Sequence, residues 1–297
     1  MADTPYIPPP DQPEDYINEF AVITFEHLWN YPRERHLPLL KDMLEAGEPP
    51  RFSIFYGDPG SGKSAVAYLM GMWASCEKWK DNNLWCGTCP KCRTVMTGRH
   101  ADRWGFYEVN ATAEDAMEHI HNARNNSNVP EGYSPGTNKG DIHDSLAAGA
   151  SGDNPRPTVT LIDEVQYIQD RPQEKLLDLI KKWPYGIVIM ATTNKDKINN
   201  ALLSRAGDHV YEFTYPLPEE VAANLIRIAA LKGSVMDHEV GLEIASRCNC
   251  EPRACLSKLQ VAVFKLKPHI TMEGFIKVFG PRKHPGTRGS GRRASNI

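Results

Sequence analysis

A glycine-rich loop between a predicted strand and a predicted helix constrains the fold of this chain most. The apolar run FSIFY at residues 52–56 leads into GDPGSGKS at residues 57–64, and the helical pattern AVAYLMGMWA follows. This order matches G-x-x-x-x-G-K-S/T, in which backbone N–H groups turn inward around phosphates and a helix N-terminus adds its positive dipole end. A chance glycine turn is the alternative, and the flanking strand and helix argue against it. The predicted phosphate-binding residues are Gly57, Asp58, Pro59, Gly60, Ser61, Gly62, Lys63 and Ser64.

An acidic pair at the end of a second apolar run completes this predicted site. In TVTLIDEVQYI, residues 158–168, a strand pattern delivers Asp163 and Glu164 at its C-terminal end, the edge where open α/β sheets bind ligands. We expect Lys63 to reach the β- and γ-phosphates of ATP, and Ser64 and Asp163 to hold Mg²⁺. Glu164 would polarise the attacking water. Alone, such a pair is usually an exposed turn or a helix cap, but the phosphate loop upstream favours the catalytic interpretation.

Strand and helix patterns alternate along most of the chain. Short runs rich in β-branched and aromatic residues are separated by helical patterns, which predicts an α/β core with a parallel sheet covered on both faces. The strand signal stops near Pro218, and the patterns that follow predict a small all-helical second domain. The predicted strands are residues 52–56, 106–109, 158–162, 186–191 and 209–213, and the helices of the second domain are residues 218–231, 237–247, 252–266 and 271–279.

The two ends and one internal interval differ from this folded pattern. Residues 1–19 are acidic and proline-rich, whereas residues 281–297 carry five Arg or Lys and no acid, and both are expected to be flexible tails. Residues 125–157 hold many Gly, Pro, Asn and Ser and are too long for an ordinary connection, so we expect a mobile insertion there. The predicted domains are therefore a core at residues 20–215 and a helical domain at residues 216–280.

Four cysteines follow the phosphate-loop helix with the spacing of metal ligands: Cys76-x9-Cys86-x2-Cys89-x2-Cys92. Four thiolates spaced in this way can close around one Zn²⁺ as a tetrahedral structural site, which places a zinc module at about residues 74–98. Such closure leaves no position for a reactive water, so no zinc catalysis is expected. Four free buried thiols are the alternative interpretation, and the regular spacing argues against it. The remaining cysteines show no ligand spacing and are expected to be packing thiols: Cys248, Cys250 and Cys255.

Charge and apolar content limit the partners and the compartment. The 297 residues include 34 basic and 37 acidic side chains and carry a net charge of -3, so any nucleic-acid contact must be confined to one region. No run approaches the roughly 18 to 20 apolar residues of a membrane span, and the N-terminus lacks the pattern of a signal peptide. Four clustered cysteines among seven fit a reducing compartment. We therefore expect a cytoplasmic protein with no membrane partner.

The order of three later segments resembles the AAA+ ATPase family: GIVIMATTN at 186–194, ALLSRAGDHVYEF at 201–213 and CEPRACLSKLQ at 250–260. The resemblance implies an AAA+ P-loop NTPase core with the helical domain as its lid. It also implies that Asn194, with Thr193 beside it, is the sensor 1 residue near the γ-phosphate, and that Arg253 is sensor 2. Arg205 corresponds to the arginine finger that completes a neighbouring subunit's site. For both arginines, a solvated surface side chain is the alternative.

The cysteine-rich insertion narrows this resemblance. Its position after the phosphate-loop helix, followed by a G-x-H-x-D-like stretch, resembles bacterial DNA polymerase clamp-loader ATPase subunits of the gamma/tau and delta-prime type. The likeness covers roughly residues 20–280. It implies that residues 24–44 pack beside the adenine and that Asn110 contacts the catalytic glutamate. The G-x-H-x-D-like stretch comprises Gly98, His100 and Asp102. The resemblance also makes Tyr31, Pro32 and Arg33 weak candidates for binding the cofactor.

The resemblance leads to three functional hypotheses. The first is an ATP-hydrolysing subunit that loads a sliding clamp in DNA replication, with non-sequence-specific DNA, a clamp or another replication protein, and identical or homologous AAA+ subunits as partners. The second is a helicase loader, or a transposition or phage regulator, that assembles on DNA as a ring or filament. Only 17 residues follow Gly280, where clamp-loader subunits continue into a helical collar, and this favours the second hypothesis. The third is a non-hydrolysing structural subunit, against which the intact phosphate-loop and acidic residues argue.

Overall fold

The computed structural model divides into two compact units, Met1–Pro216 and Leu217–Ile297. Several predicted features lie outside the described residues: the N-terminal tail, Pro32, the G-x-H-x-D-like stretch, most of the 125–157 insertion and nearly all of the C-terminal tail. The described residues are 22, 24–31, 33–78, 84–96, 106–125, 157–168, 170–181 and 186–282.

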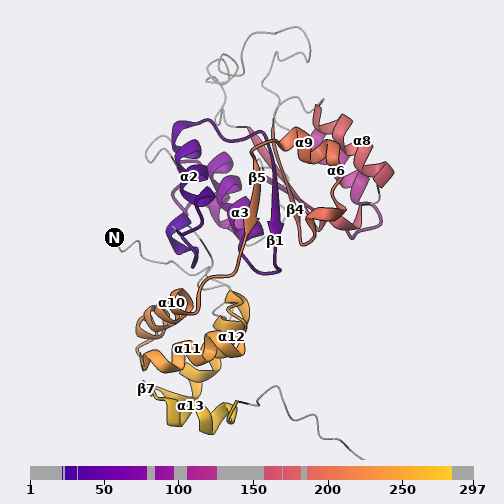
Figure 1. Cartoon of the computed structure of the whole chain (residues 1–297). Coiled ribbons are helices and arrows are strands. Elements are labelled where there is room, and N and C mark those ends of the chain that lie inside the picture. Colours follow the sequence, from indigo (N-terminus) through magenta and orange to yellow (C-terminus); the bar gives the residue numbers. More distant parts are fainter. Residues whose placement is uncertain are drawn as a thin grey trace, which may run out of the picture. The chain divides into compact units, whose positions relative to one another are not determined.

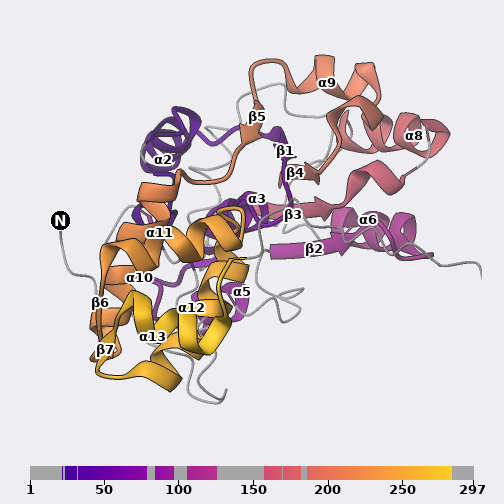
Figure 2. The same ribbon diagram turned by 60° about the horizontal axis from the view of Figure 1, so that its bottom comes forward.

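A five-stranded parallel sheet forms the centre of the first unit, which confirms the predicted α/β class. The strand order is β2-β3-β4-β1-β5, and all four neighbouring pairs are parallel (Figure 2). Because helices cover both faces of such a sheet, its strands are continuous apolar runs. The strands are β1 Phe52–Gly57, β2 Phe106–Asn110, β3 Thr158–Asp163, β4 Gly186–Thr192 and β5 Val210–Phe213.

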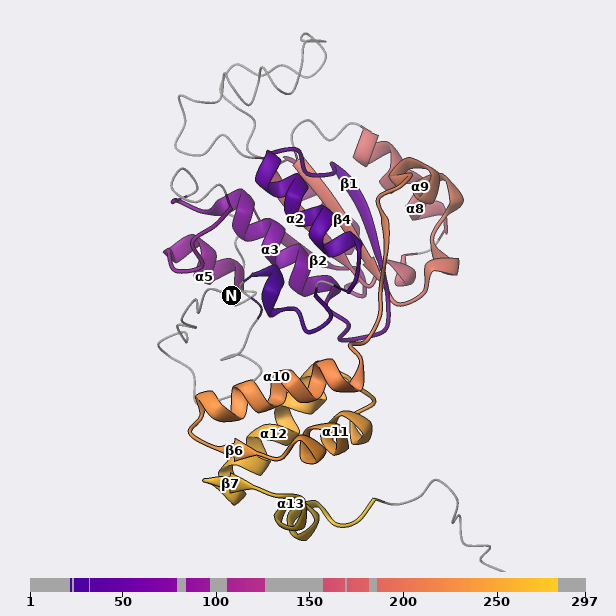
Figure 3. The ribbon, with the colours of Figure 1, turned by 60° about the vertical axis from the view of Figure 1, so that its left-hand side comes forward.

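Helices lie on both faces of this sheet and enclose two separate apolar cores (Figures 1 and 3). Successive side chains of a strand point to opposite faces, so Phe55 of β1 belongs to one core and its neighbour Ile54 to the other. One core is closed by α2 His36–Ala46, α3 Lys63–Ser75 and α5 Pro90–Met96, and the other by α6 Ala116–Asn125, α8 Asp170–Lys181 and α9 Asn200–Ala206. Short 3-10 turns also belong to this unit: η1 Phe25–His27, η3 Val165–Tyr167 and η4 Lys195–Lys197.

The first residue of the phosphate loop is a glycine for a steric reason. Gly57 ends β1 with a φ of 139°, and a Cβ atom at this position would lie 2.0 Å from the carbonyl oxygen of Phe213 in β5. No other residue type fits this backbone approach without moving a strand. The edge strand β5 therefore sets the geometry of the loop from its first residue.

The second unit is built mainly from four helices, whose observed bounds differ by at most one residue from the predicted ones. A pair of two-residue parallel strands also forms within it, which the prediction of an all-helical domain missed (Figure 3). Two residues are too few to show the alternation by which strands are recognised. No helix among the described residues has the length and apolar character to cross a membrane. The elements are α10 Pro218–Leu231, β6 Val235–Met236, α11 His238–Arg247, α12 Pro252–Leu266, β7 His269–Ile270 and α13 Met272–Phe279.

Candidate nucleotide site and cysteine cluster

The phosphate loop connects β1 to α3 and encloses a buried lysine. Gly60 and Gly62 have φ values of 74° and 108°, which turn the loop in a way that L-residues rarely adopt. Lys63, the first residue of α3, is only 6% exposed. Its Nζ atom donates hydrogen bonds to the carbonyl oxygens of Gly57 at 2.8 Å and Asp58 at 2.7 Å. The loop carbonyls thus hold the lysine cation at the start of the helix.

A hydroxyl group and a carboxylate from distant motifs meet beside this lysine. The Ser64 Oγ atom donates to Asp163 Oδ2 at 3.2 Å, although 99 residues separate the two in the sequence. Burial is the main reason that the pKa of Asp163 is raised, and it outweighs hydrogen bonds from the Glu164 backbone N–H and the Ser64 hydroxyl. Hydroxyl and carboxylate oxygens are ligands that Mg²⁺ prefers when phosphates supply the others. The donor set therefore fits Mg²⁺ bound together with a nucleotide.

Glu164 follows β3 in an unusual backbone conformation. Its φ and ψ values of 58° and 38° lie in the left-handed region, which costs a residue other than glycine on the order of 1–3 kcal/mol. The Gln166 Nε2 atom donates a short hydrogen bond to Glu164 Oε2. This contact was not predicted, because a glutamine in a 3-10 turn belongs to no sequence motif. Its polar character between Val165 and Tyr167 is the one signal that the sequence offers.

The end of β4 lies next to this glutamate through the same glutamine. Thr192 donates from Oγ1 to Gln166 Oε1 at 2.7 Å, and it accepts a hydrogen bond from the Asn194 backbone N–H at 3.0 Å. Asn194 itself is exposed, and its Oδ1 atom accepts from the Asp196 N–H at 3.0 Å as the cap of η4. The structure therefore places the predicted sensor residue one strand away from Asp163, because β3 and β4 are neighbours in the sheet.

The resemblance implies a contact between Asn110 and Glu164, but the structure gives the side-chain oxygen of Asn110 another partner. In the described part of the chain, the Asn110 Oδ1 atom accepts from both the backbone N–H and the hydroxyl of Thr112, at 2.9 and 2.8 Å. This is an Asx-type turn, a common role of asparagine at the end of a strand. Gln166, rather than Asn110, hydrogen-bonds the side chain of Glu164.

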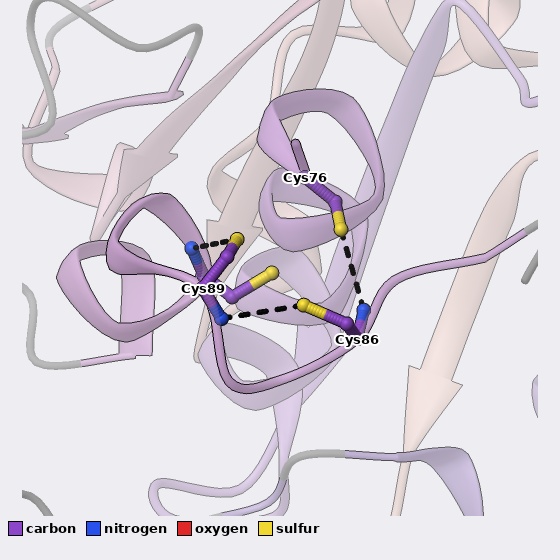
Figure 4. Close-up of side chains that lie close together, drawn as sticks. Cys76, Cys86 and Cys89 are labelled. Atoms are coloured by element: carbon purple, nitrogen blue, oxygen red, sulfur yellow. Dashed lines mark hydrogen bonds between the residues drawn. The ribbon is translucent and has the colours of Figure 1, made fainter. Parts of the chain in front are cut away.

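The four clustered cysteines converge as the metal-site prediction requires. Their Sγ atoms lie within 4.8 Å of one another, and three of the four residues are buried. Figure 4 shows that Cys76 comes from the end of α3, whereas Cys86 and Cys89 come from the chain that leads into α5. Four Zn–S bonds of about 2.3 Å in a tetrahedron place sulfur atoms roughly 3.8 Å apart. The positions and the all-thiol chemistry of this group therefore fit a structural Zn²⁺.

Backbone N–H groups stabilise negative charge on these sulfur atoms. Cys86 N lies 3.3 Å from Cys76 Sγ, Cys89 N lies 3.2 Å from Cys86 Sγ, and Cys92 N lies 3.5 Å from Cys89 Sγ (Figure 4). A hydrogen bond from Cys92 lowers the pKa of the Cys76 thiol to about 5. The same contact and burial raise the pKa of the Cys92 thiol. Without a cation, four thiolates would repel one another, so a bound metal ion would favour full ionisation.

The three remaining cysteines lie in the second unit. Cys248 and Cys255 are buried and Cys250 is half-buried, with Cys255 in α12 contacting Cys248 at the end of α11. The one metal-binding group of cysteine, histidine and acidic side chains among the described residues is the cluster in the first unit. We therefore keep the interpretation of these three residues as packing thiols.

Comparison with known proteins identifies the family. The model of the family described as "DNA polymerase III, delta subunit" matches residues 33–212, which is more than half of the chain. The chain belongs to this family. This match confirms the resemblance to clamp-loader-type AAA+ proteins. No curated protein matches the sequence.

Solved structures confirm the AAA+ fold of this family member. The RuvB Holliday junction branch migration motor of Thermotoga maritima matches with a TM-score of 0.53 and 16% identity, over 87% of this chain and 71% of that one. A point mutant of the same motor matches with a TM-score of 0.54 and 15% identity, over the same shares of both chains. At this identity the likeness concerns the fold alone.

The structure describes three further arginines to which the family resemblance assigns a role. Arg205 is exposed in the last turn of α9 of the first unit, and Arg253 is exposed in the first turn of α12 of the second. Arg33 donates to the Tyr215 carbonyl oxygen at 3.0 Å, and the Tyr215 hydroxyl donates to the Pro59 carbonyl oxygen at 2.8 Å. The N-terminal segment is thereby joined to the phosphate loop through Tyr215. The roles of these side chains in this family member stay predictions.

Proposed function

We propose that this member of the DNA polymerase III delta-subunit family is an ATP-hydrolysing AAA+ subunit. The hydrogen bond of 3.2 Å between Ser64 Oγ and Asp163 Oδ2, beside the buried Lys63, carries the proposal. It joins a phosphate-binding loop to an acidic strand end, and phosphoryl transfer needs both. The proposal requires bound ATP and Mg²⁺ at this edge of the sheet.

Each side chain of the site has a distinct part in this proposal. The loop N–H groups and Lys63 bind the phosphates, while Ser64 and Asp163 hold Mg²⁺, which neutralises charge on the phosphate oxygens. Glu164 orients and polarises the water that attacks the γ-phosphate, and Asn194 lies at the neighbouring strand end to contact the same phosphate. This complete set of polar groups argues against a non-hydrolysing structural subunit.

We propose that the second unit is the lid of this ATPase and that the cysteine cluster is a structural zinc module. Four thiolates leave no open coordination position, so the metal would hold α3 to α5 rather than take part in hydrolysis. In this proposal Arg253 is the sensor 2 residue of the lid, and the junction between core and lid lies between Pro216 and Leu217. The tails and the 125–157 insertion are assigned no part in catalysis.

We propose that the protein assembles with identical or homologous subunits and that the exposed Arg205 is the arginine finger of such an assembly. We expect Arg205→Ala to lower hydrolysis by a factor of about 10³ or more, because an arginine supplied in trans neutralises charge in the transition state. Mixing this variant with Lys63→Ala subunits should restore part of the activity, since the intact Arg205 of one subunit completes the intact loop of the other. The measurement is the steady-state ATPase rate of each variant and of the mixture.

A second exposed arginine provides the control for Arg205→Ala. Arg227→Ala removes another exposed arginine, on α10, and should leave the rate unchanged. If Arg205→Ala is inactive and mixing restores nothing, the arginine does not act across a subunit boundary.

The cargo that the resemblance to clamp-loader subunits implies is a sliding clamp on DNA. We expect the ATPase rate to rise when primed DNA and a sliding clamp are added together. In a clamp-loading assembly, ATP hydrolysis is coupled to the binding and release of these substrates. No increase with any clamp would contradict clamp loading. Rings or filaments on duplex DNA without a clamp, seen by negative-stain electron microscopy, would select the alternative of a helicase loader or a transposition or phage regulator.

A further inference from the structure

The side-chain amide of Gln166 connects two strand ends of the proposed ATPase site. Its Nε2 atom donates to the carboxylate of Glu164 and to Thr193 Oγ1 at 3.0 Å. Its Oε1 atom accepts from the Thr192 hydroxyl at 2.7 Å, and the Thr193 N–H lies 3.4 Å from it. All four contacts come from residues at the ends of β3 and β4 or directly after them. Gln166 therefore belongs to neither motif of the site but touches both.

We propose that Gln166 is a positioning residue that holds the Glu164 carboxylate for its work on the attacking water. The inference rests on the proposed ATPase function and names a further residue of that same site. Glu164 has a left-handed backbone conformation, which sets the direction in which its side chain leaves the chain but not the position of the carboxylate at its end. The amide N–H group supplies the missing restraint at the carboxylate itself.

The chemistry of the contacts fixes which way the amide points. An ionised carboxylate only accepts hydrogen bonds, so the NH2 group of Gln166 must face Glu164. The carbonyl end then faces the hydroxyl of Thr192, a side chain that is 1% exposed and therefore requires a partner for its polar atom. Turning the amide by half a turn would put two acceptors together at Glu164. The charged neighbour therefore sets the orientation, and the Thr192 hydroxyl is compatible with it, although this hydroxyl also lies 3.1 Å from the Asn194 carbonyl oxygen.

The same network links Glu164 with the residue proposed to contact the γ-phosphate. Thr192, which donates to Gln166, also accepts from the backbone N–H of Asn194. A movement of Asn194 would therefore reach Thr192 first, then Gln166, and finally Glu164. Gln166 is the link in this chain that can be substituted without altering a proposed ligand of phosphate or Mg²⁺.

The experiment compares Gln166→Met, which keeps length and loses both polar ends, with Gln166→Glu, which keeps the acceptor and loses the donor. We expect kcat of Gln166→Met to fall by about 10–100-fold, because a displacement of about 1 Å of a catalytic group costs that much. The dissociation constant of a fluorescent ATP analogue should stay within about twofold, since phosphate ligands are untouched. Gln166→Glu should lose more, because it sets a second carboxylate against Glu164.

A double-mutant cycle separates positioning from general structural damage. In a Glu164→Gln background, Gln166→Met should have no further effect on the residual rate, because its effect passes through Glu164. The matched control is Gln173→Met, which removes a buried amide that donates to the Ile168 and Lys197 carbonyl oxygens. We expect this control to lower the melting temperature while keeping kcat.

Thermal stability tests the hydrogen bond between Gln166 and Glu164 independently of the ATPase assay. Gln166→Glu should lower the melting temperature, and combining it with Glu164→Gln should recover it, because donor and acceptor then exchange places. An unchanged kcat in Gln166→Met, or losses that multiply in the Glu164→Gln background, would overturn the inference. If the wild-type protein itself hydrolyses no ATP under any condition, the proposed function fails instead, and the two failures are distinguishable.

Discussion

Lys63→Ala should abolish the ATPase activity proposed for this protein. The lysine is the one side chain of the phosphate loop that carries positive charge, and removing a single preorganised donor at a transition state already costs about 10²–10³ in rate. Because the ammonium group would bind phosphates in both ground and transition states, nucleotide affinity should fall as well. The measurements are the steady-state rate and the dissociation constant of a fluorescent ATP analogue.

The fold should survive this substitution. Lys63 lies against the carbonyl oxygens of Gly57 and Asp58, and water can reach these groups once the long side chain is gone. Lys181→Ala is the control: it removes a half-exposed lysine of α8 that pairs with Asp178 at 3.7 Å, a contact of little energetic value. Normal hydrolysis by Lys63→Ala would show that the phosphate loop is not the site of catalysis.

Loss of the cysteine-bound metal should have the largest effect on stability. Cys76, Cys89 and Cys92 belong to the apolar core that also contains residues of α2 and α3, and Cys86 packs against it, so the site is continuous with one core of the first unit. If removing Zn²⁺ or substituting Cys92→Ala costs about 5 kcal/mol, the melting temperature falls by about 10–20 °C. Elemental analysis of the purified protein should find one zinc ion per chain, and chelation should lower both zinc content and melting temperature.

Cys250→Ala is the matched control for the zinc prediction. It removes a half-buried thiol of the second unit that is separate from the cluster. Zinc content should stay the same in this variant, and the melting temperature should change by only a few degrees. A metal-free protein with an unchanged melting temperature in Cys92→Ala would contradict a structural zinc site.

Local sequence signals were sufficient for the strands, the helices of the second unit and the convergence of the four cysteines. Buried parallel strands are continuous apolar runs, and each predicted strand is present with its bounds shifted by one residue at most. The convergence of four cysteines was predictable because thiolate spacing reflects the geometry of a single ion. The meeting of Ser64 with Asp163 was predictable because parallel strands bring their carboxyl ends to one edge.

Features that depend on side-chain partners from other elements were not predictable. Asn110 bonds to Thr112 beside it, because asparagine at a strand end can satisfy itself locally, and so the glutamate takes its partner from Gln166. The polar character of Gln166 between Val165 and Tyr167 is its only mark in the sequence, and this mark does not reveal the partners of its amide. Likewise, the need for Gly57 arises from the Phe213 backbone on a neighbouring strand, which only the sheet register reveals.

Helix α3 connects the proposed nucleotide site to the cysteine cluster. It begins with Lys63 in the phosphate loop and ends at Ser75, directly before Cys76, and its 13 residues span roughly 20 Å. A helix transmits a shift or rotation of one end to the other, because its hydrogen bonds leave little freedom between them. A zinc ion bound as proposed would anchor Cys76 and would therefore also restrain the amino end of α3, where the proposed phosphate site lies. If both proposed sites are occupied, removal of the metal at one end of the helix should therefore lower the affinity for nucleotide at the other.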